Sequence, residues 1–129
     1  MTTELTLLAL TVLLGFVQIV LAAHAKSAQY GYRWNLGARD ESMPPLDPVP
    51  GRLDRALKNL IETFPFFAAA VLIAHVAGRD GALTWWGAQL YFWARVAYVP
   101  AYAAGVPLLR TMVWNVAAIG IGLILIALI

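Results

Sequence analysis

The chain has 129 residues, of which 61% are hydrophobic and 12% are charged, with a formal net charge of +2. Soluble domains carry about 25% charged residues, so this is the composition of a membrane protein, and the small net charge does not indicate nucleic-acid binding. Cysteine is absent, which excludes disulfides, thiolate metal ligands and a cysteine nucleophile within the chain. The length predicts a single domain, residues 1–129.

The first of four predicted membrane helices covers about residues 5–25, since a helix needs about 20 apolar residues to cross a bilayer. It ends in Ala23-His24-Ala25, a pattern found at signal-peptide cleavage sites. However, the residues before it contain Glu4 and no basic residue, and the apolar run exceeds the roughly 7–15 residues of a signal peptide. We therefore expect a retained helix.

The segment 26–50 is the one long loop and carries much of the positive charge. The loop and the start of the next helix hold six of the nine basic residues, namely Lys26, Arg33, Arg39, Arg52, Arg55 and Lys58. The positive-inside rule places this loop in the cytoplasm. With four spans, both chain ends then lie on the non-cytoplasmic side.

The remaining helices are predicted over about 51–77, 81–103 and 107–129, joined by short turns. Asp80 is placed to cap the third helix, and Pro107 suits the first position of the fourth. His24 and His75 end different helices on opposite sides, so no metal site is expected. The sequence thus predicts an all-α integral membrane protein that folds as an up-down four-helix bundle.

Polar residues gather on one face of the second helix. At about 100° per residue, Arg55, Lys58, Asn59 and Glu62 fall within one stripe. Counting at about 1.5 Å per residue, Glu62 lies about 22 Å from the non-cytoplasmic end of its helix and is level with Arg95 of the third helix. We expect Glu62 to pair with Arg55, Asn59 or Arg95, within its own or a neighbouring subunit.

The third helix carries a second polar face, formed by Tyr91, Arg95, Tyr98 and Tyr102, and Arg110 at the start of the fourth helix falls near the same depth. Several cations and phenols around one carboxylate describe a pocket for an anionic ligand. The alternative is that the cations are ordinary positive-inside anchors, the tyrosines belong to an interfacial belt, and the glutamate forms a structural ion pair.

Two stretches resemble a known family. RALKNLIETFPFF, residues 55–67, resembles the helix-two pattern R-x-x-x-N-x-x-E…P-x-F of the MAPEG family, the membrane-associated proteins in eicosanoid and glutathione metabolism. ARVAYVPAY…PLLRT is similar to that family's helix-three arginine and tyrosine pattern, with an arginine opening helix four. The likeness extends over roughly residues 5–129, and the loop sequence Gly37-Ala38-Arg39-Asp40-Glu41 resembles the compact bacterial branch.

The resemblance implies a homotrimer of four-helix bundles, surrounded by membrane lipids in the bacterial inner membrane, with glutathione bound between subunits near the cytoplasmic side. Carried over by motif position, the glutathione-binding residues are Arg55, Lys58, Asn59, Glu62, Arg95, Tyr98 and Tyr102. The residues carried over as catalytic are Arg110, which would activate the glutathione thiol, and Thr111 beside it.

The function implied is that of a membrane glutathione transferase or peroxidase acting on hydrophobic electrophiles from the lipid phase. In the prostaglandin synthase branch a tyrosine lies one helical turn after the activating arginine, whereas this chain has Trp114, which disfavours isomerase chemistry. Two alternatives stay open. The chain could be a non-catalytic lipid- or thiol-binding protein of the same fold, or a structural helper without a ligand.

Overall fold

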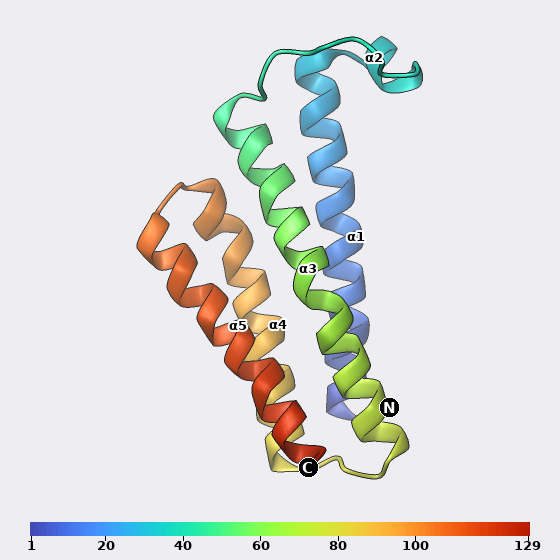
Figure 1. Ribbon diagram of the computed structural model, residues 1–129, viewed down its shortest axis with the longest axis vertical. Coiled ribbons are helices and arrows are strands. Elements are labelled where there is room, and N and C mark those ends of the chain that lie inside the picture. The colour runs from blue at the N-terminus through green and yellow to red at the C-terminus, as the bar shows by residue number, and fades with distance from the viewer.

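The computed structural model describes residues 1–129 as five helices and no strands. The helices are α1 (Thr3–Tyr30), α2 (Tyr32–Leu36), α3 (Pro48–Val76), α4 (Ala82–Ala103) and α5 (Pro107–Ala127). The four long helices run alternately up and down, so the predicted all-α four-helix bundle is confirmed, and α2 is a short extra helix in the first loop (Figure 1).

Both chain termini and the α3–α4 turn lie at one end of the bundle, and the first loop and the α4–α5 turn lie at the other (Figure 1). Three helices, α1, α3 and α5, are long and apolar enough to cross a membrane. The expected third span, α4, is not among them, because Gln89, Arg95 and its tyrosines make it more polar. Short turns join α4 to α3 and α5, so it runs through the same layer as its neighbours.

Helix ends follow local backbone chemistry rather than the apolar runs alone. α1 continues beyond Ala25 to Tyr30 and stops at Gly31, whose φ of 94° is a left-handed conformation that favours glycine. α3 and α5 both begin with a proline in the first turn, where the missing N–H costs nothing. The polar end of α1, residues 26–30, therefore extends past the apolar run into the loop region.

The predicted capping role of Asp80 is wrong. Gly81 is the N-cap of α4, and its backbone N–H donates to the Thr84 hydroxyl at 2.8 Å. Asp80 instead pairs with the Nδ1 atom of His75 at 3.1 Å, which closes the α3–α4 turn. Thr84 also donates to the buried carboxylate of Glu4 at 2.9 Å and so connects α1 to α4.

Two contacts fix α4 against its neighbours. Phe67 of α3 and Tyr91 of α4 are fully buried and stack with their ring centres 4.1 Å apart, and the Tyr91 hydroxyl hydrogen-bonds Thr63 at 2.8 Å. On the opposite side, Gly87 of α4 meets Gly120 of α5 so closely that a Cβ atom on Gly87 would lie 2.5 Å from the Gly120 carbonyl oxygen. These contacts set the rotation of α4, and with it the direction in which its polar face points.

Candidate functional site

A groove of about 250 Å³ opens among α3, α4 and α5, in the half of the bundle that carries the α4–α5 turn. Its lining residues are Arg55, Lys58, Asn59 and Glu62 of α3, Tyr98 and Tyr102 of α4, and Arg110 of α5. The α3 residues recur at intervals of about three and four positions, which places them on one helix face. Seven residues predicted from the sequence therefore meet in one hollow.

The sequence predicts that Arg95 lines the groove, but Arg95 is not among the lining residues. Its side chain is fully buried, Nη1 donates to Asn59 Oδ1 at 2.7 Å, and Nη2 donates to the Ala56 carbonyl at 3.4 Å. Its guanidinium also lies 4.2 Å from the centre of the Tyr98 ring. Arg95 thus stands behind the wall of the groove and orients Asn59 and Tyr98, both of which do face the groove.

The groove has more positive than negative charge. Arg55, Lys58 and Arg110 contribute three cations, and Glu62 contributes the one carboxylate. Neither arginine forms an ion pair within the chain. Such an excess of guanidinium groups suits a ligand with carboxylate groups, because an arginine can bind a carboxylate through two parallel hydrogen bonds.

The three cations are held by different contacts. Arg55 Nε donates to the Tyr102 hydroxyl at 3.0 Å, and the Arg110 guanidinium lies 5.1 Å from the centre of the same ring. The ammonium of Lys58 pairs with Asp54 at 3.1 Å, and Asp54 also holds Lys26 of α1 at 3.2 Å. Tyr102 therefore contacts both arginines, while the charge of Lys58 is partly neutralised by Asp54.

Glu62 has no ion pair and no side-chain hydrogen bond within the chain, and its side chain is exposed. The predicted pairing with a residue of its own chain is therefore wrong, and pairing with a neighbouring subunit stays a prediction. An unpaired charge at the bilayer centre costs about 2.5–3.5 kcal/mol on insertion scales, and less at the off-centre depth of Glu62. The carboxylate consequently favours a cationic partner from outside the chain.

A hollow of about 160 Å³ adjoins the groove on the α5 side and contains Thr111 and Trp114, together with Arg110. The Thr111 hydroxyl donates to the Pro107 carbonyl at 3.1 Å, so its hydrogen is already used by the backbone. This arrangement leaves Arg110 as the one cationic group that the hollow offers to a reacting atom.

Arg52 is a site residue that the sequence reasoning missed. It lines a further hollow of about 140 Å³ with Arg55 and Arg110. Its Nη1 donates to the Ala103 carbonyl at 3.0 Å, and its guanidinium lies over Gly105, whose φ is 73°. The spacing in the sequence could have identified Arg52, because it precedes Arg55 by three positions and so lies on the same helix face.

These observations define an integral membrane helical bundle with a cationic groove at one end. Comparison with protein-family models matches residues 7–129 to the MAPEG family, which is nearly the whole chain. The chain belongs to the MAPEG family. No curated protein matches the chain in a sequence comparison. Membership supports, in general terms, a membrane protein with a transferase, peroxidase or related function connected with glutathione.

Proposed function

We propose that the protein is a membrane transferase or peroxidase that uses glutathione against hydrophobic electrophiles. The observation that carries the proposal is the groove, where one carboxylate without a partner, Glu62, lies among three cationic side chains. Glutathione has two carboxylates, one ammonium and one thiol. Arg55 and Arg110, with Lys58, suit its carboxylates, and Glu62 suits its ammonium.

The chemistry that glutathione supplies is nucleophilic attack by its thiolate. A cation beside a thiol favours the thiolate form, and Arg110 is not neutralised by any carboxylate of the chain. Conjugation forms a carbon–sulfur bond while the leaving group departs with the electrons of its own bond, and the thiol proton goes to solvent. Arg110 acts by stabilising negative charge on the sulfur before attack.

The second substrate is proposed to arrive from the lipid phase. α5 presents exposed apolar side chains on the segment that follows Arg110, including Met112 and Trp114. An electrophile partitioned among acyl chains would meet this surface directly. No phenol occupies the position of Trp114, so the proposed chemistry stays conjugation or reduction rather than isomerisation.

The proposal extends to assembly and location. A homotrimer in which a neighbouring subunit covers the groove would give the exposed Glu62 a partner and reduce the apolar surface of the bundle. The concentration of basic residues in the first loop and the adjoining start of α3 supports a cytoplasmic position for that end. Both termini would then lie on the non-cytoplasmic side of a bacterial inner membrane.

Calorimetric titration with glutathione and an aryl-halide conjugation assay, both on the protein in detergent, test these assignments. Glu62→Gln and Arg55→Ala are expected to weaken binding about 10-fold or more, the value of one lost charge-assisted contact of about 1.5–3 kcal/mol. Arg79→Ala, at the opposite end of the bundle, is the control and should bind normally. Absence of binding at millimolar glutathione would rule out both ligand-binding functions.

Arg110→Ala separates catalysis from binding. A rise of one unit in the thiol pKa lowers the thiolate fraction about tenfold near neutral pH, so the conjugation rate at saturating glutathione should fall at least that much. An unchanged rate would refute thiol activation by Arg110. If the wild type binds glutathione but shows no conjugation, the non-catalytic alternative is favoured. The Thr111 hydroxyl already donates to the backbone and is therefore not available to assist the thiol.

A further inference from the structure

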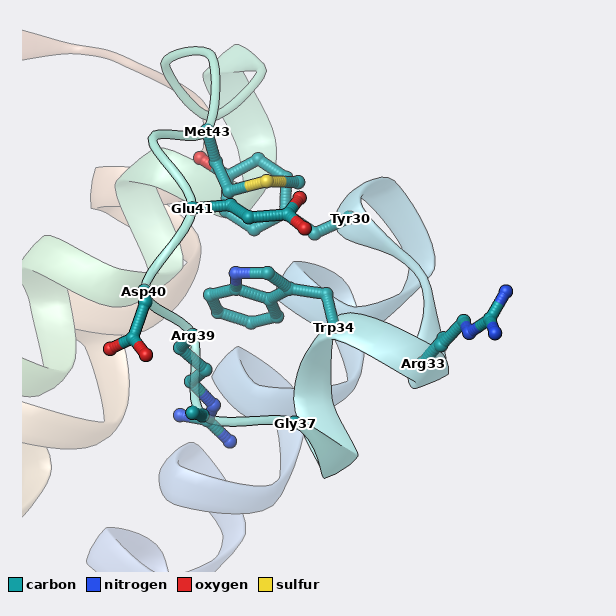
Figure 2. A pocket seen from close by; sticks show the side chains of 9 residues that line it. Tyr30, Arg33, Trp34, Gly37, Arg39, Asp40, Glu41 and Met43 are labelled. Atoms are coloured by element: carbon teal, nitrogen blue, oxygen red, sulfur yellow. The ribbon is translucent and has the colours of Figure 1, made fainter.

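A second and larger hollow, of about 420 Å³, lies in the first loop, away from the groove (Figure 2). Its floor is Trp34, the central residue of α2. The Tyr30 ring packs edge-on against Trp34 with 4.9 Å between ring centres, and the Tyr30 hydroxyl donates to the Pro44 carbonyl across the loop. The hollow is therefore built by ordered contacts between the end of α1, α2 and the segment that follows.

Opposite charges line this hollow without pairing to one another. In Figure 2 the side chains of Arg39 and Glu41 lie on either side of the Trp34 ring, and the Arg39 guanidinium is 4.8 Å from the ring centre. Neither Glu41 nor the adjacent Asp40 forms an ion pair within the chain. The Glu41 carboxylate and the Arg39 guanidinium therefore have no oppositely charged partner within the chain, and together they suit the two charges of one zwitterionic ligand.

An unused hydrogen-bond donor lies in the same hollow. The indole Nε1 of Trp34 is buried and has no partner. A buried N–H without an acceptor is unfavourable, so the hollow favours a ligand that supplies an oxygen there. Arg39 is held in place by hydrogen bonds to Asn35 and keeps a φ of 60°, which is uncommon for a residue other than glycine.

The position of the hollow indicates where its ligand comes from. The apolar run of α1 ends at Ala25, and the helix continues to Tyr30. At about 1.5 Å per residue, α2 follows about 7–8 Å beyond the apolar run, which corresponds to the headgroup region that flanks a hydrocarbon core of about 30 Å. Tyrosine and tryptophan are enriched at this level of a membrane. Phospholipid headgroups are the most abundant zwitterions there.

We propose that this hollow binds the headgroup of a zwitterionic phospholipid with a primary ammonium group. The phosphate accepts from Arg39 and from the indole N–H of Trp34, and the ammonium donates to the carboxylate of Glu41, which lies over the Trp34 ring in Figure 2. A primary ammonium fits better than a quaternary one, because Arg39 already covers one face of the indole and leaves no aromatic box around a methylated cation.

Native mass spectrometry of the full-length protein in non-ionic detergent tests this site. Phosphatidylethanolamine, phosphatidylcholine and phosphatidylglycerol of identical chains serve as probes. Phosphatidylethanolamine is expected to bind at least several-fold more tightly than the other two. Equal binding of all three lipids would overturn the proposal.

Two substitutions assign the contacts. Glu41→Gln should remove the preference for phosphatidylethanolamine and leave the binding of phosphatidylglycerol unchanged. Trp34→Phe should weaken the binding of all three lipids. The control is Trp86→Phe, an exposed tryptophan near the start of α4 and therefore distant from the first loop. If Trp34→Phe does not fold, Arg39→Gln replaces it and should weaken the binding of all three lipids, because Arg39 is the other proposed ligand of the phosphate. Retention of the preference in Glu41→Gln would contradict the assignment.

Soluble headgroups identify the source of the ligand. Phosphoethanolamine at millimolar concentration should displace the bound lipid partially, and glycerol phosphate should not. If free phosphoethanolamine binds as tightly as the lipid, the site is for a soluble phosphate ester and the lipid assignment is wrong. Glutathione titration of the same variants should be unchanged, because the hollow shares no residue with the groove.

Discussion

Substituting Gly87 by alanine tests the close contact between α4 and α5. The added Cβ atom would lie 2.5 Å from the Gly120 carbonyl oxygen and 2.6 Å from Cγ1 of Ile124. A carbon and a carbonyl oxygen approach to about 3.3 Å at closest, so the overlap is about 0.8 Å. The carbonyl belongs to the helix backbone and cannot rotate away, hence the two helices must separate.

Overpacking of this kind costs about 1–3 kcal/mol. The substitution also gains up to about 1 kcal/mol, because alanine favours a helix more than glycine does. Gly122→Ala on α5 is the matched control, since a Cβ atom there meets nothing within 4 Å. The control should show only the stabilisation that comes from the higher helix propensity of alanine. The difference in free energy of unfolding between the two variants therefore gives the cost of the steric overlap, about 1–3 kcal/mol.

The measurement is the thermal unfolding temperature of each variant in the same detergent. At about 4 °C per kcal/mol, Gly87→Ala should unfold about 4–12 °C below Gly122→Ala. Equal unfolding temperatures would refute the close approach of the two helices, and a lower temperature for Gly122→Ala would show that α5 is rotated from the described position.

Three further predictions concern the groove and the residues around it. Gly105→Ala should cost about 1–2 kcal/mol of stability, because φ is 73° and the Cβ atom would lie 2.8 Å from Cζ of Arg52. Thermal unfolding against the unsubstituted protein checks it, and equal stability would contradict it. Arg95→Lys should weaken glutathione binding about 10-fold, because an ammonium cannot reproduce the guanidinium contacts to Asn59 and Tyr98; full affinity by titration would show that Arg95 positions neither. Asp54→Asn should free Lys58 and raise glutathione affinity by up to about 5-fold at low salt, the value of an exposed ion pair; the gain should disappear at high salt, and a gain that persisted would exclude this electrostatic cause.

Much of the architecture could be predicted from the sequence. Apolar runs of membrane length predict the long helices, and the three- and four-residue spacing from Arg55 to Glu62 predicts a shared face, which the structure turns toward one groove. Proline at the start of α5 and the short polar turn after α3 mark two of the boundaries. These features depend on local chemistry, which a single sequence contains.

The arrangement between helices could not be predicted in the same way. Residue counting gives the depth of Arg95 along its helix but not the rotation of α4 against α3, which the stacking of Phe67 on Tyr91 determines. Arg95 consequently lies behind the groove rather than in its lining. The spacing along the helix also could not show that Glu62 has no ion-pair partner within the chain, because that depends on how the helices pack.

The burial of Arg95 has an electrostatic consequence. Salt screens exposed charges over about 8–10 Å but has little effect on a charge enclosed by protein. The guanidinium has no carboxylate partner in the chain, so its field extends into the groove through the wall formed by Asn59 and Tyr98. Part of the positive potential of the groove should therefore persist at ionic strengths that suppress the contributions of Lys58 and Arg55.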